Sequence, residues 1–396
     1  MAKNFDSNRQ RRRICFVATV PIALKWFMSP HITLLKEKYD ITLVANGSSA
    51  DLVGLLDSNI SFMPLKIERQ ISIKNDILSL INLCRLFHRE RFDSVHSIMP
   101  KSGMLSMLAA RLVGVPLRFH TFTGQVWVTQ KGLRKFLLKF FDKFLVINAT
   151  RVLADSHSQR LFLIENKIVS SRSISVLAEG SFSGVDLVRF NYNAIARHQV
   201  RLNYKIPSEG IVFLFLGRLK RDKGLVDLLR AFEIVAERKK NVHLLIVGPD
   251  EDNLETEVLT SVKRFPRHVH RFGYTERPED YLSASDVLCL PSYREGFPNV
   301  PLQAASIGIP TIGSKIYGII DAVEDGMTGL LHQPYSIEGL ADAMLLLASN
   351  KDLRLRMGVA AHQRVMSKFS EQILTKAFAD FYFEAFLQYE NNLSHE

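Results

Sequence analysis

Short runs of β-branched residues alternate with amphipathic segments along almost the whole chain, and this alternation restricts the possible folds more than any other feature. The first half is predicted to form strands at 14–19, 41–45, 94–98 and 152–154, with helices at 50–57 and 104–113. Such alternation is typical of a parallel sheet that is covered by helices on both faces. The expected class is therefore α/β.

The pattern breaks between residues 180 and 210 and then begins again. The break ends in the turn cluster Pro207-Ser208-Glu209-Gly210. Beyond it, the chain is predicted to form strands at 211–216, 242–248, 268–272 and 286–290, with helices at 225–239, 254–265 and 278–284. We therefore predict two doubly wound units that are joined near residue 200.

These boundaries define four parts of the chain: a basic arm at 1–13, a first domain at 14–200, a second domain at 205–370 and a helix at 371–390. The last part is aromatic-rich and amphipathic, so it is expected to pack back on the body. In open α/β sheets, ligands bind beyond the carboxyl ends of the strands. We therefore expect the ligand to bind in the cleft between the two domains.

The chain is basic, with a net charge of +11 and a pI near 9.5. This charge favours polyanionic partners: nucleic acid, an anionic membrane or phosphorylated substrates. The cations fall in three separate places, namely the run 9–13, the segment 131–143 and the segment 218–223. Because no nucleic-acid-binding module accompanies them, a non-catalytic nucleic-acid binder is the less favoured interpretation.

The cysteine and hydropathy patterns favour the cytoplasm. Cys15, Cys84 and Cys289 are far apart and lack metal-ligand spacing, which predicts buried thiols in a reducing compartment. No apolar run reaches the ~18 residues of a transmembrane helix. The apolar run 14–24 follows basic residues, as in a signal peptide, but Lys25 ends it, so a buried first strand is favoured.

The segment 291–310 predicts a strand end, a turn, a helix and the next strand. Asn299 is expected to cap the helix, Pro301 suits its first turn, and Gly308 marks its end. Glu295 then lies just ahead of a helix N-terminus, whose free N–H groups attract anions. An acid beside an anion site suits a sugar nucleotide, which carries hydroxyls and phosphates. The alternative is an ordinary turn with a solvated glutamate.

The loop Gly217-Arg218-Leu219-Lys220-Arg221-Asp222-Lys223-Gly224 directly follows the predicted strand 211–216. Four of its residues are cations. Each hydrogen bond from Arg or Lys to a charged group is worth about 1.5–3 kcal/mol. The loop is therefore a candidate for binding a diphosphate and stabilising its departure. The alternative is a basic surface turn.

Taken together, five motifs resemble bacterial glycosyltransferases of family 4, which have the GT-B fold of two Rossmann-like domains facing across a cleft. The resemblance covers residues 14 to about 390. In their order and spacing the motifs are highly specific: Gly217-Arg218…Lys223-Gly224, Val247-Gly248-Pro249, Arg271-Phe272-Gly273-Tyr274, the segment 292–308, and Asp325-Gly326-Met327-Thr328-Gly329-Leu330-Leu331. The resemblance implies sugar transfer from a nucleotide-sugar donor, with retention at the anomeric carbon and without a metal ion or other cofactor.

The resemblance also implies roles for individual residues. Arg218 and Lys223 should hold the donor diphosphate, and Glu295 should contact a sugar hydroxyl. His120, expected in a Thr/Gly-rich loop after 115–119, matches the first-domain histidine near the reaction centre, so His120 and Glu295 are the candidate catalytic residues. The candidate donor site comprises Gly217, Arg218, Lys223, Gly248, Tyr274, Glu295, Gly296, Phe297, Pro298, Asn299, Val300 and Gln303.

The sequence departs from the family pattern at two places. Gln303 stands where the family has a second acidic residue that binds both ribose hydroxyls, and an amide offers only one acceptor and one donor group. Val20-Pro21-Ile22-Ala23 replaces the usual glycine pair after the first strand, so acceptor contacts there are not carried over. Asp250-Glu251-Asp252 matches the D-x-D of metal-dependent transferases, but its flanks fit the GT-B pattern and no metal is predicted.

The segment 131–147 predicts an amphipathic helix with phenylalanines on one face. Its basic residues are Lys131, Arg134, Lys135, Lys139 and Lys143. A basic, Phe-rich helix is typical of a membrane-surface element, with about 1 kcal/mol of attraction per cation near an anionic bilayer. A core helix with cations at its rim is equally compatible with the pattern.

These observations favour a retaining glycosyltransferase that moves a hexose or N-acetylhexosamine from a UDP-sugar to a lipid-linked glycan. The segments 27–31, 95–97 and 120–127 resemble transferases that extend undecaprenyl-diphosphate-linked O-antigen, capsule or related glycans. Such an enzyme would be cytoplasmic and peripheral on the inner face of the bacterial cytoplasmic membrane. A sugar-nucleotide epimerase of the same fold is the nearest alternative.

Overall fold

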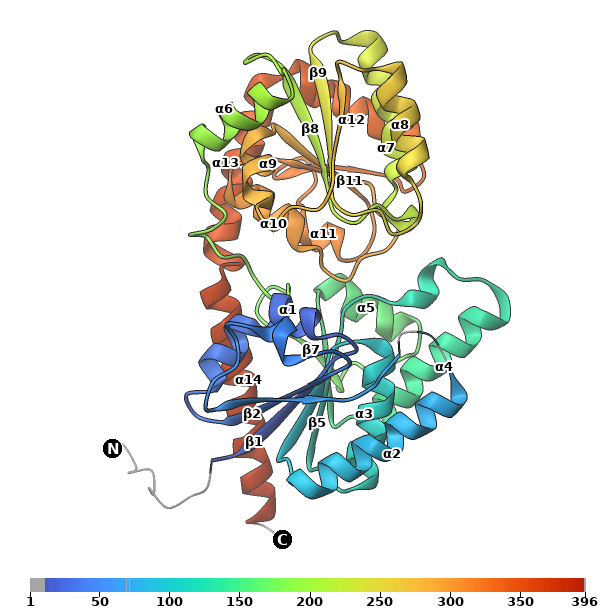
Figure 1. Cartoon of the computed structure of the whole chain (residues 1–396), viewed down its shortest axis with the longest axis vertical. Coiled ribbons are helices and arrows are strands. Elements are labelled where there is room, and N and C mark those ends of the chain that lie inside the picture. Colours follow the sequence, from blue (N-terminus) through green and yellow to red (C-terminus); the bar gives the residue numbers. More distant parts are fainter. Residues whose placement is uncertain (1–10, 69, 71, 395–396) are drawn as a thin grey trace.

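The computed structural model describes residues 11–68, 70 and 72–394 and forms two α/β domains stacked along the long axis (Figure 1). The first domain holds a seven-stranded sheet in the order β3-β2-β1-β4-β5-β6-β7, and the second a six-stranded sheet in the order β10-β9-β8-β11-β12-β13. Each sheet extends in both directions from its first strand, as in doubly wound folds. The predicted α/β, GT-B-like class is confirmed.

All strands in the two sheets pair in parallel. The strands are β1 (Arg13–Val17), β2 (Asp40–Ala45), β3 (Ile60–Pro64), β4 (Ser94–Ser97), β5 (Leu117–Phe122), β6 (Arg151–Ala154), β7 (Ile174–Val176), β8 (Ile211–Leu216), β9 (Val242–Val247), β10 (Val269–Phe272), β11 (Val287–Leu290), β12 (Thr311–Ser314) and β13 (Gly329–His332). The first-domain helices are α1 (Pro21–Leu35), η1 (Ser49–Leu52), α2 (Ile73–Glu90), α3 (Pro100–Leu112), η2 (Val126–Thr129), α4 (Gly132–Asn148) and α5 (His157–Glu165). The remaining helices are α6 (Ala194–Asn203), η3 (Arg221–Lys223), α7 (Leu225–Arg238), α8 (Glu255–Arg264), α9 (Pro278–Ala284), α10 (Asn299–Ser306), α11 (Ile319–Ala322), α12 (Ile337–Ser349), α13 (Lys351–Lys368) and α14 (Glu371–Leu393).

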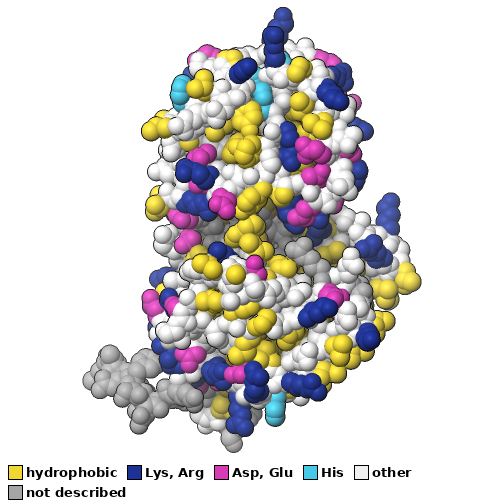
Figure 2. All heavy atoms as spheres, viewed as in Figure 1, with side chains coloured by type: hydrophobic (Ala, Val, Ile, Leu, Met, Phe, Trp, Pro, Cys, Tyr) yellow, Lys and Arg dark blue, Asp and Glu magenta, His cyan; other side chains and the backbone are white. Residues whose placement is uncertain are grey.

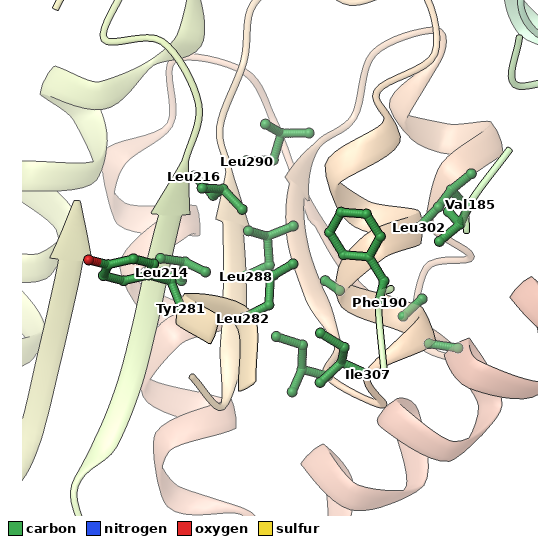
Figure 3. Packing of buried hydrophobic residues seen from close by; sticks show 14 of the residues in the cluster. Val185, Phe190, Leu214, Leu216, Tyr281, Leu282, Leu288, Leu290, Leu302 and Ile307 are labelled. Carbon is green, nitrogen blue, oxygen red and sulfur yellow. The ribbon is translucent and has the colours of Figure 1, made fainter. Parts of the chain in front are cut away.

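The central strand β8 is buried on both faces, which explains its unbroken apolar sequence. Because successive side chains of a strand point to opposite faces, Leu214 and Leu216 join one core cluster and Phe213 and Phe215 join the other. Figure 3 shows Leu214 and Leu216 beside the leucines of the neighbouring strand β11. This packing fixes the register of the two strands whose loops form the candidate site.

One predicted helix is wrong. Instead of a helix over 50–57, the structure has the short helix η1, which is followed by turns. The side chain of Asp51 accepts a hydrogen bond from the N–H of Ser48 over 2.9 Å and closes a single turn. Gly54 then has a φ of +88°, in the left-handed region, where a right-handed helix cannot continue.

Two segments connect the domains. Helix α6 packs on the second domain, where Arg197 and Arg201 each pair with Asp286 at 2.8 Å. Our sequence division at residue 200 placed most of this helix with the first domain. In the other direction, the chain returns along α14 to cover the first sheet, as Figure 1 shows. There the hydroxyl of Tyr382 lies 2.9 Å from Nδ1 of His96.

The two connections are hydrogen-bonded to each other where they pass between the domains. The N–H of Val185 donates to the carbonyl of Phe369, and the N–H of Glu371 donates to the carbonyl of Val185, each over 2.9 Å. The covalent connection between the domains therefore consists of two backbone segments that are hydrogen-bonded to each other.

The basic N-terminal arm is described only from residue 11, and Arg9 lies outside the described residues. Arg11 pairs with Asp40 at 2.9 Å, and Arg13 pairs with Glu90 at 2.6 Å. These arginines therefore hold the start of β1 against the first domain. Among the described residues, no helix combines the length and apolar character needed to cross a membrane.

Candidate functional site

Two loops at the carboxyl ends of neighbouring strands form the centre of the candidate site. The loop 217–224 follows β8, the turn 291–298 follows β11, and these strands pair directly. The N–H of Tyr293 donates to the carbonyl of Asp222 over 2.8 Å. The guanidinium of Arg294 pairs with the carboxylate of Asp222 at 2.8 Å. The two loops are therefore held side by side.

This arrangement brings Lys223 and Glu295 together. Nζ of Lys223 lies 2.6 Å from Oε1 of Glu295, and the two side chains are 19% and 12% exposed. Because little water screens them, their attraction is stronger than that of a surface pair. A cation and an acid in contact at the end of the sheet suit a ligand that carries both phosphates and hydroxyls.

Arg218, the other predicted diphosphate ligand, lies in a different ion pair. Its guanidinium is 3.0 Å from the carboxylate of Glu251, which also lies 3.4 Å from Nζ of Lys220. The side chain of Arg218 is 49% exposed, and such solvated pairs contribute only about 0–1 kcal/mol. A diphosphate could therefore replace Glu251 as the partner of Arg218 with little loss of free energy.

The acidic triplet 250–252 is engaged in local structure. The carboxylate of Asp250 accepts hydrogen bonds from the N–H groups of Asp252, Leu254 and Glu255, over 2.9–3.1 Å. These bonds lower the pKa of Asp250, although burial opposes them. Within the described part of the chain, no cluster of three or more His, Cys, Asp or Glu side chains could hold a metal ion. The metal-independence of the reaction stays a prediction.

The predicted glycines line the same edge of the second sheet. A Cβ on Gly248 would lie 2.0 Å from the carbonyl oxygen of Gly217, so the loops after β8 and β9 meet backbone to backbone. Gly248 has a φ of +139°, which favours glycine. Tyr274, beyond β10, is 55% exposed. The structure thus leaves its ring accessible to a ligand.

Asn299 is not the N-cap of α10, which corrects our expectation. It is the first residue of the helix, Pro298 occupies the cap position, and no side chain caps this end. Oδ1 of Asn299 instead accepts a hydrogen bond from Oγ of Ser181, over 3.1 Å. The predicted end of the helix at Gly308 is confirmed by its φ of +83°. Gln303 is half-buried one turn into α10.

The turn around Gly296 touches the first domain directly. A Cβ on Gly296 would lie 2.4 Å from the carbonyl oxygen of Thr123. A Cβ on Gly124 would lie 3.1 Å from the backbone nitrogen of Gly296. Gly318, in the second domain, approaches the same turn, since its Cβ would lie 2.0 Å from the oxygen of Gly296. Two backbone segments, 123–124 and the one that contains Gly318, therefore converge on Gly296.

We expected His120 in a loop, but it lies inside β5 and is fully buried. Its Nδ1 lies 2.8 Å from Oγ of Ser97, and its Nε2 is a buried atom without a hydrogen-bond partner among the described residues. Burial lowers the pKa of His120 to about 3, so the ring is neutral near pH 7. Thr123 and Gly124, which follow β5, reach the Glu295 turn instead.

Several residues at the interface between the domains carry no motif and were missed by sequence analysis. Tyr317 stacks on Phe162, with ring centroids 4.4 Å apart, and Asp321 accepts hydrogen bonds from Ser158. Asp155 is buried beside the linker. Only their place in the sequence could have indicated them, because loops that directly follow strands such as β6 and β12 are expected to line the cleft.

Asp155 combines burial with contacts from two parts of the chain. Burial raises the pKa of Asp155 to about 8, although the nearby N–H groups of Phe182, in the linker, and Phe297, in the second domain, lower it. Its Oδ1 is a buried atom without a hydrogen-bond partner among the described residues. The side chain is therefore protonated near pH 7, and it helps to join the first domain to the Glu295 turn.

The chain matches two family profiles. "Glycosyl transferases group 1" matches residues 197–364, and "Glycosyl transferase 4-like domain" matches residues 33–180. Together the two profiles fall on both domains. The chain belongs to glycosyltransferase family 4 and is a glycosyltransferase of the hexosyltransferase type.

Individual proteins resemble the chain over most of its length. The capsular polysaccharide biosynthesis glycosyltransferase CapM of Staphylococcus aureus is 27% identical over 376 residues, which cover 94% of this chain and 97% of CapM. The UDP-Gal:alpha-D-GlcNAc-diphosphoundecaprenol alpha-1,3-galactosyltransferase of Escherichia coli is 29% identical over 346 residues, covering 85% and 87% of the two chains. Anabaena Alr3699/HepE, solved in complex with UDP and glucose, has a TM-score of 0.78 at 15% identity, covering 94% of this chain and 100% of HepE. This last likeness shows the shared fold.

Replacing Asp155 with Asn should change how stability depends on pH. In the wild type, the unfolded chain loses the proton of Asp155 near its ordinary pKa of 3.8, whereas the folded protein keeps it up to about 8. This contribution to stability is complete below pH about 4 and is lost progressively as the pH rises to about 8. The melting temperature of Asp155→Asn relative to wild type should therefore rise between pH 4 and pH 8. Thermal unfolding across this range measures the effect.

The matched control for this experiment is Asp342→Asn, because Asp342 is exposed on α12. Its melting temperature should follow that of the wild type across the same pH range. Parallel curves for Asp155→Asn and the wild type would show that Asp155 is ionised in the folded protein.

Proposed function

We propose that this glycosyltransferase moves a hexose or N-acetylhexosamine from a UDP-sugar to a lipid-linked glycan, with retention at the anomeric carbon. The observation that carries the proposal is the partly buried pair of Lys223 and Glu295 at the cleft. A bound donor can separate this pair, because its diphosphate can contact Lys223 and a sugar hydroxyl can contact Glu295.

The reaction follows from these positions. The bond between the anomeric carbon and the diphosphate oxygen breaks, and its electron pair stays on that oxygen, where Lys223 and Arg218 stabilise the charge. The acceptor hydroxyl attacks the anomeric carbon from the face that the diphosphate leaves. Its proton passes to the departing phosphate oxygen. The step requires no protein nucleophile, and configuration is retained.

Gln303 is proposed to bind the ribose of the donor. The side-chain amide can accept a hydrogen bond from one ribose hydroxyl and donate a hydrogen bond to the other. Its place one turn into α10, beyond the Glu295 turn, supports this role.

The acceptor is proposed from two relatives. The S. aureus relative acts in capsular polysaccharide biosynthesis, and the E. coli relative transfers to a diphosphoundecaprenol-linked sugar. We infer a lipid-linked glycan acceptor of this class for the present chain. Membership in a transferase family favours this function over the epimerase and nucleic-acid-binding alternatives.

Helix α4 is proposed to dock on an anionic membrane, where such an acceptor resides. Leu133, Phe136 and Phe140 are 72%, 66% and 53% exposed, so much of its apolar face is not part of the core. On α2, Ile73 and Ile77 are 77% and 52% exposed. Hydrophobic and basic side chains lie side by side along this edge of the first domain (Figure 2). This exposure favours a membrane-surface helix over a core helix.

One cation of α4 is turned inward. Nζ of Lys139 donates to Oδ1 of Asn166 over 3.0 Å and lies 4.9 Å from the ring centre of Trp127. Nζ of Lys135 also lies over this ring, 6.0 Å from its centre. Docking is assigned to Lys131, Arg134, Lys135 and Lys143, which lack the bond that Lys139 makes to Asn166.

The donor can be identified by thermal-shift measurements with UDP-, GDP- and ADP-sugars. A ligand at 100 times its dissociation constant stabilises a protein by about 2.7 kcal/mol. We expect one UDP-sugar to raise the melting temperature of the wild type by several degrees. The Lys223→Ala/Glu295→Ala variant should lose this rise, whereas Lys376→Ala/Glu384→Ala, altered at exposed positions on α14, should keep it. The absence of a rise with every UDP-sugar, or a rise that survives in the first variant, would contradict the proposed donor site.

Membrane docking can be tested by flotation with vesicles that contain phosphatidylglycerol. The wild type should float with these vesicles and not with pure phosphatidylcholine, because each cation adds about 1 kcal/mol at an anionic surface. Arg134→Glu/Lys135→Glu/Lys143→Glu should stay at the bottom of the gradient. The control Lys239→Glu/Lys351→Glu/Lys376→Glu carries the same change in charge at other exposed positions and should still float. Equal flotation of both variants would refute docking through α4.

A further inference from the structure

The loop beyond β12 reaches across the cleft to the first domain. The ring of Tyr317 stacks on that of Phe162 in α5, with centroids 4.4 Å apart and planes inclined by 22°. The N–H of Gln125 donates to the hydroxyl of Tyr317 over 3.4 Å. Burial raises the pKa of Tyr317 to about 12, so the hydroxyl stays neutral and can accept this bond.

Asp321 makes a second contact with the same helix. Its carboxylate accepts hydrogen bonds from the N–H of Ser158, over 3.2 and 3.3 Å, and from the hydroxyl of Ser158. That hydroxyl in turn accepts from the N–H of Gly318 over 2.8 Å. Ser158 lies in the first turn of α5, where the helix favours a negative charge.

These contacts lie next to the turn that carries Glu295. Gln125 directly follows Gly124, and Gly318 directly follows Tyr317. Gly124 and Gly318 lie in the two segments that converge on Gly296. Any movement of Tyr317 relative to Gln125 would therefore move Thr123 and Gly124 relative to the Glu295 turn.

These contacts between the domains can break and form again. In the described part of the chain, no core cluster includes apolar residues from both sides of the cleft at this point. The domains meet here through one stacked ring pair and a few hydrogen bonds, which water can replace when the cleft opens. A transferase needs such an opening to release its nucleotide product, and lids of this kind often limit turnover.

The stack also continues into the first domain. Phe162 stacks on Trp127, with centroids 5.2 Å apart and planes inclined by 16°. Trp127 is buried, and its Nε1–H donates to the carboxylate of Asp142 in α4 over 2.7 Å. Trp127 is therefore a natural reporter of the contact, since an open cleft would uncover the ring beside it.

We propose that Tyr317, together with Asp321, is a latch between the domains that holds the segment 123–125 against the Glu295 turn. Tyr317 is a positioning residue that acts on the transfer step through Gln125 and Gly124. Asp321 adds to the latch by anchoring the first turn of α5. The latch concerns closure of the cleft and does not depend on which sugar is transferred.

The test uses a Trp26→Phe background, in which Trp127 is the remaining tryptophan. Acrylamide quenching of its fluorescence should increase in Tyr317→Ala and in Phe162→Ala. Quenching in the double variant should not exceed quenching in either single variant. Tyr317→Phe keeps the ring stack, so acrylamide should quench its Trp127 fluorescence to the same extent as in the Trp26→Phe background. Asp321→Asn should give an intermediate increase. No nucleotide is needed for this measurement, so its result does not depend on the identity of the donor.

A second readout separates positioning from general damage to the fold. UDP affinity, measured by calorimetry, should change less than about threefold in Tyr317→Ala, because the donor ligands are untouched. Turnover of the UDP-sugar that gives the largest thermal shift should fall by about 10- to 100-fold, as expected when reacting groups are misplaced. Tyr317→Phe keeps the stack on Phe162 but loses the bond from Gln125, so its turnover should lie between that of Tyr317→Ala and that of the wild type.

Three results would overturn the latch. These are unchanged quenching in Tyr317→Ala, additive quenching in the Tyr317→Ala/Phe162→Ala double variant, and a loss of UDP affinity as large as the loss of turnover. Melting temperatures identify any variant that fails to fold, and Asp321→Asn, which conserves size, then provides the decisive measurement.

Discussion

Two backbone turns meet across the cleft with no side chain between them, and the geometry of the site depends on this contact. The turn that carries Glu295 belongs to the second domain, and the segment 123–124 belongs to the first. Gly296 permits the approach, because a Cβ there would lie 2.4 Å from the carbonyl oxygen of Thr123. The first domain is therefore brought within contact of the residues proposed to hold the donor.

The electrostatics of the site are arranged around exchangeable ion pairs. Lys223 pairs with Glu295, and Arg218 pairs with Glu251, so each proposed diphosphate ligand has an acidic partner in the absence of a donor. These partners satisfy the cations without fixing them, and they also limit the attraction of unrelated anions. The buried, protonated carboxyl of Asp155 joins the domains nearby without adding a negative charge near pH 7.

Much of the fold and the centre of the site could be predicted from the sequence. Strands such as β8 are unbroken apolar runs between turn signals, and Lys223 and Glu295 lie in loops directly after two of them. His120 was placed in a loop because sequence pattern does not show where a strand ends, and Thr121 and Phe122 extend β5 to the segment that reaches the cleft. Asn299 was expected to cap α10, but a hydrogen bond from Ser181 of the linker engages its side chain. Contacts such as those of Tyr317 depend on how two domains meet, and no local pattern encodes that.

The most direct test of the central contact is the rate of sugar transfer by Gly296→Ala, measured together with UDP binding. Gly296 does not have a φ in the left-handed region, so alanine is compatible with its backbone, and the added Cβ acts on the approach of the segment 123–124. Because Gly296 also belongs to the candidate donor site, UDP affinity can fall, but it should fall much less than transfer, which should decrease by about 10- to 100-fold because the first domain can no longer close on the turn. Transfer at the wild-type rate would show that the reaction does not require this backbone contact.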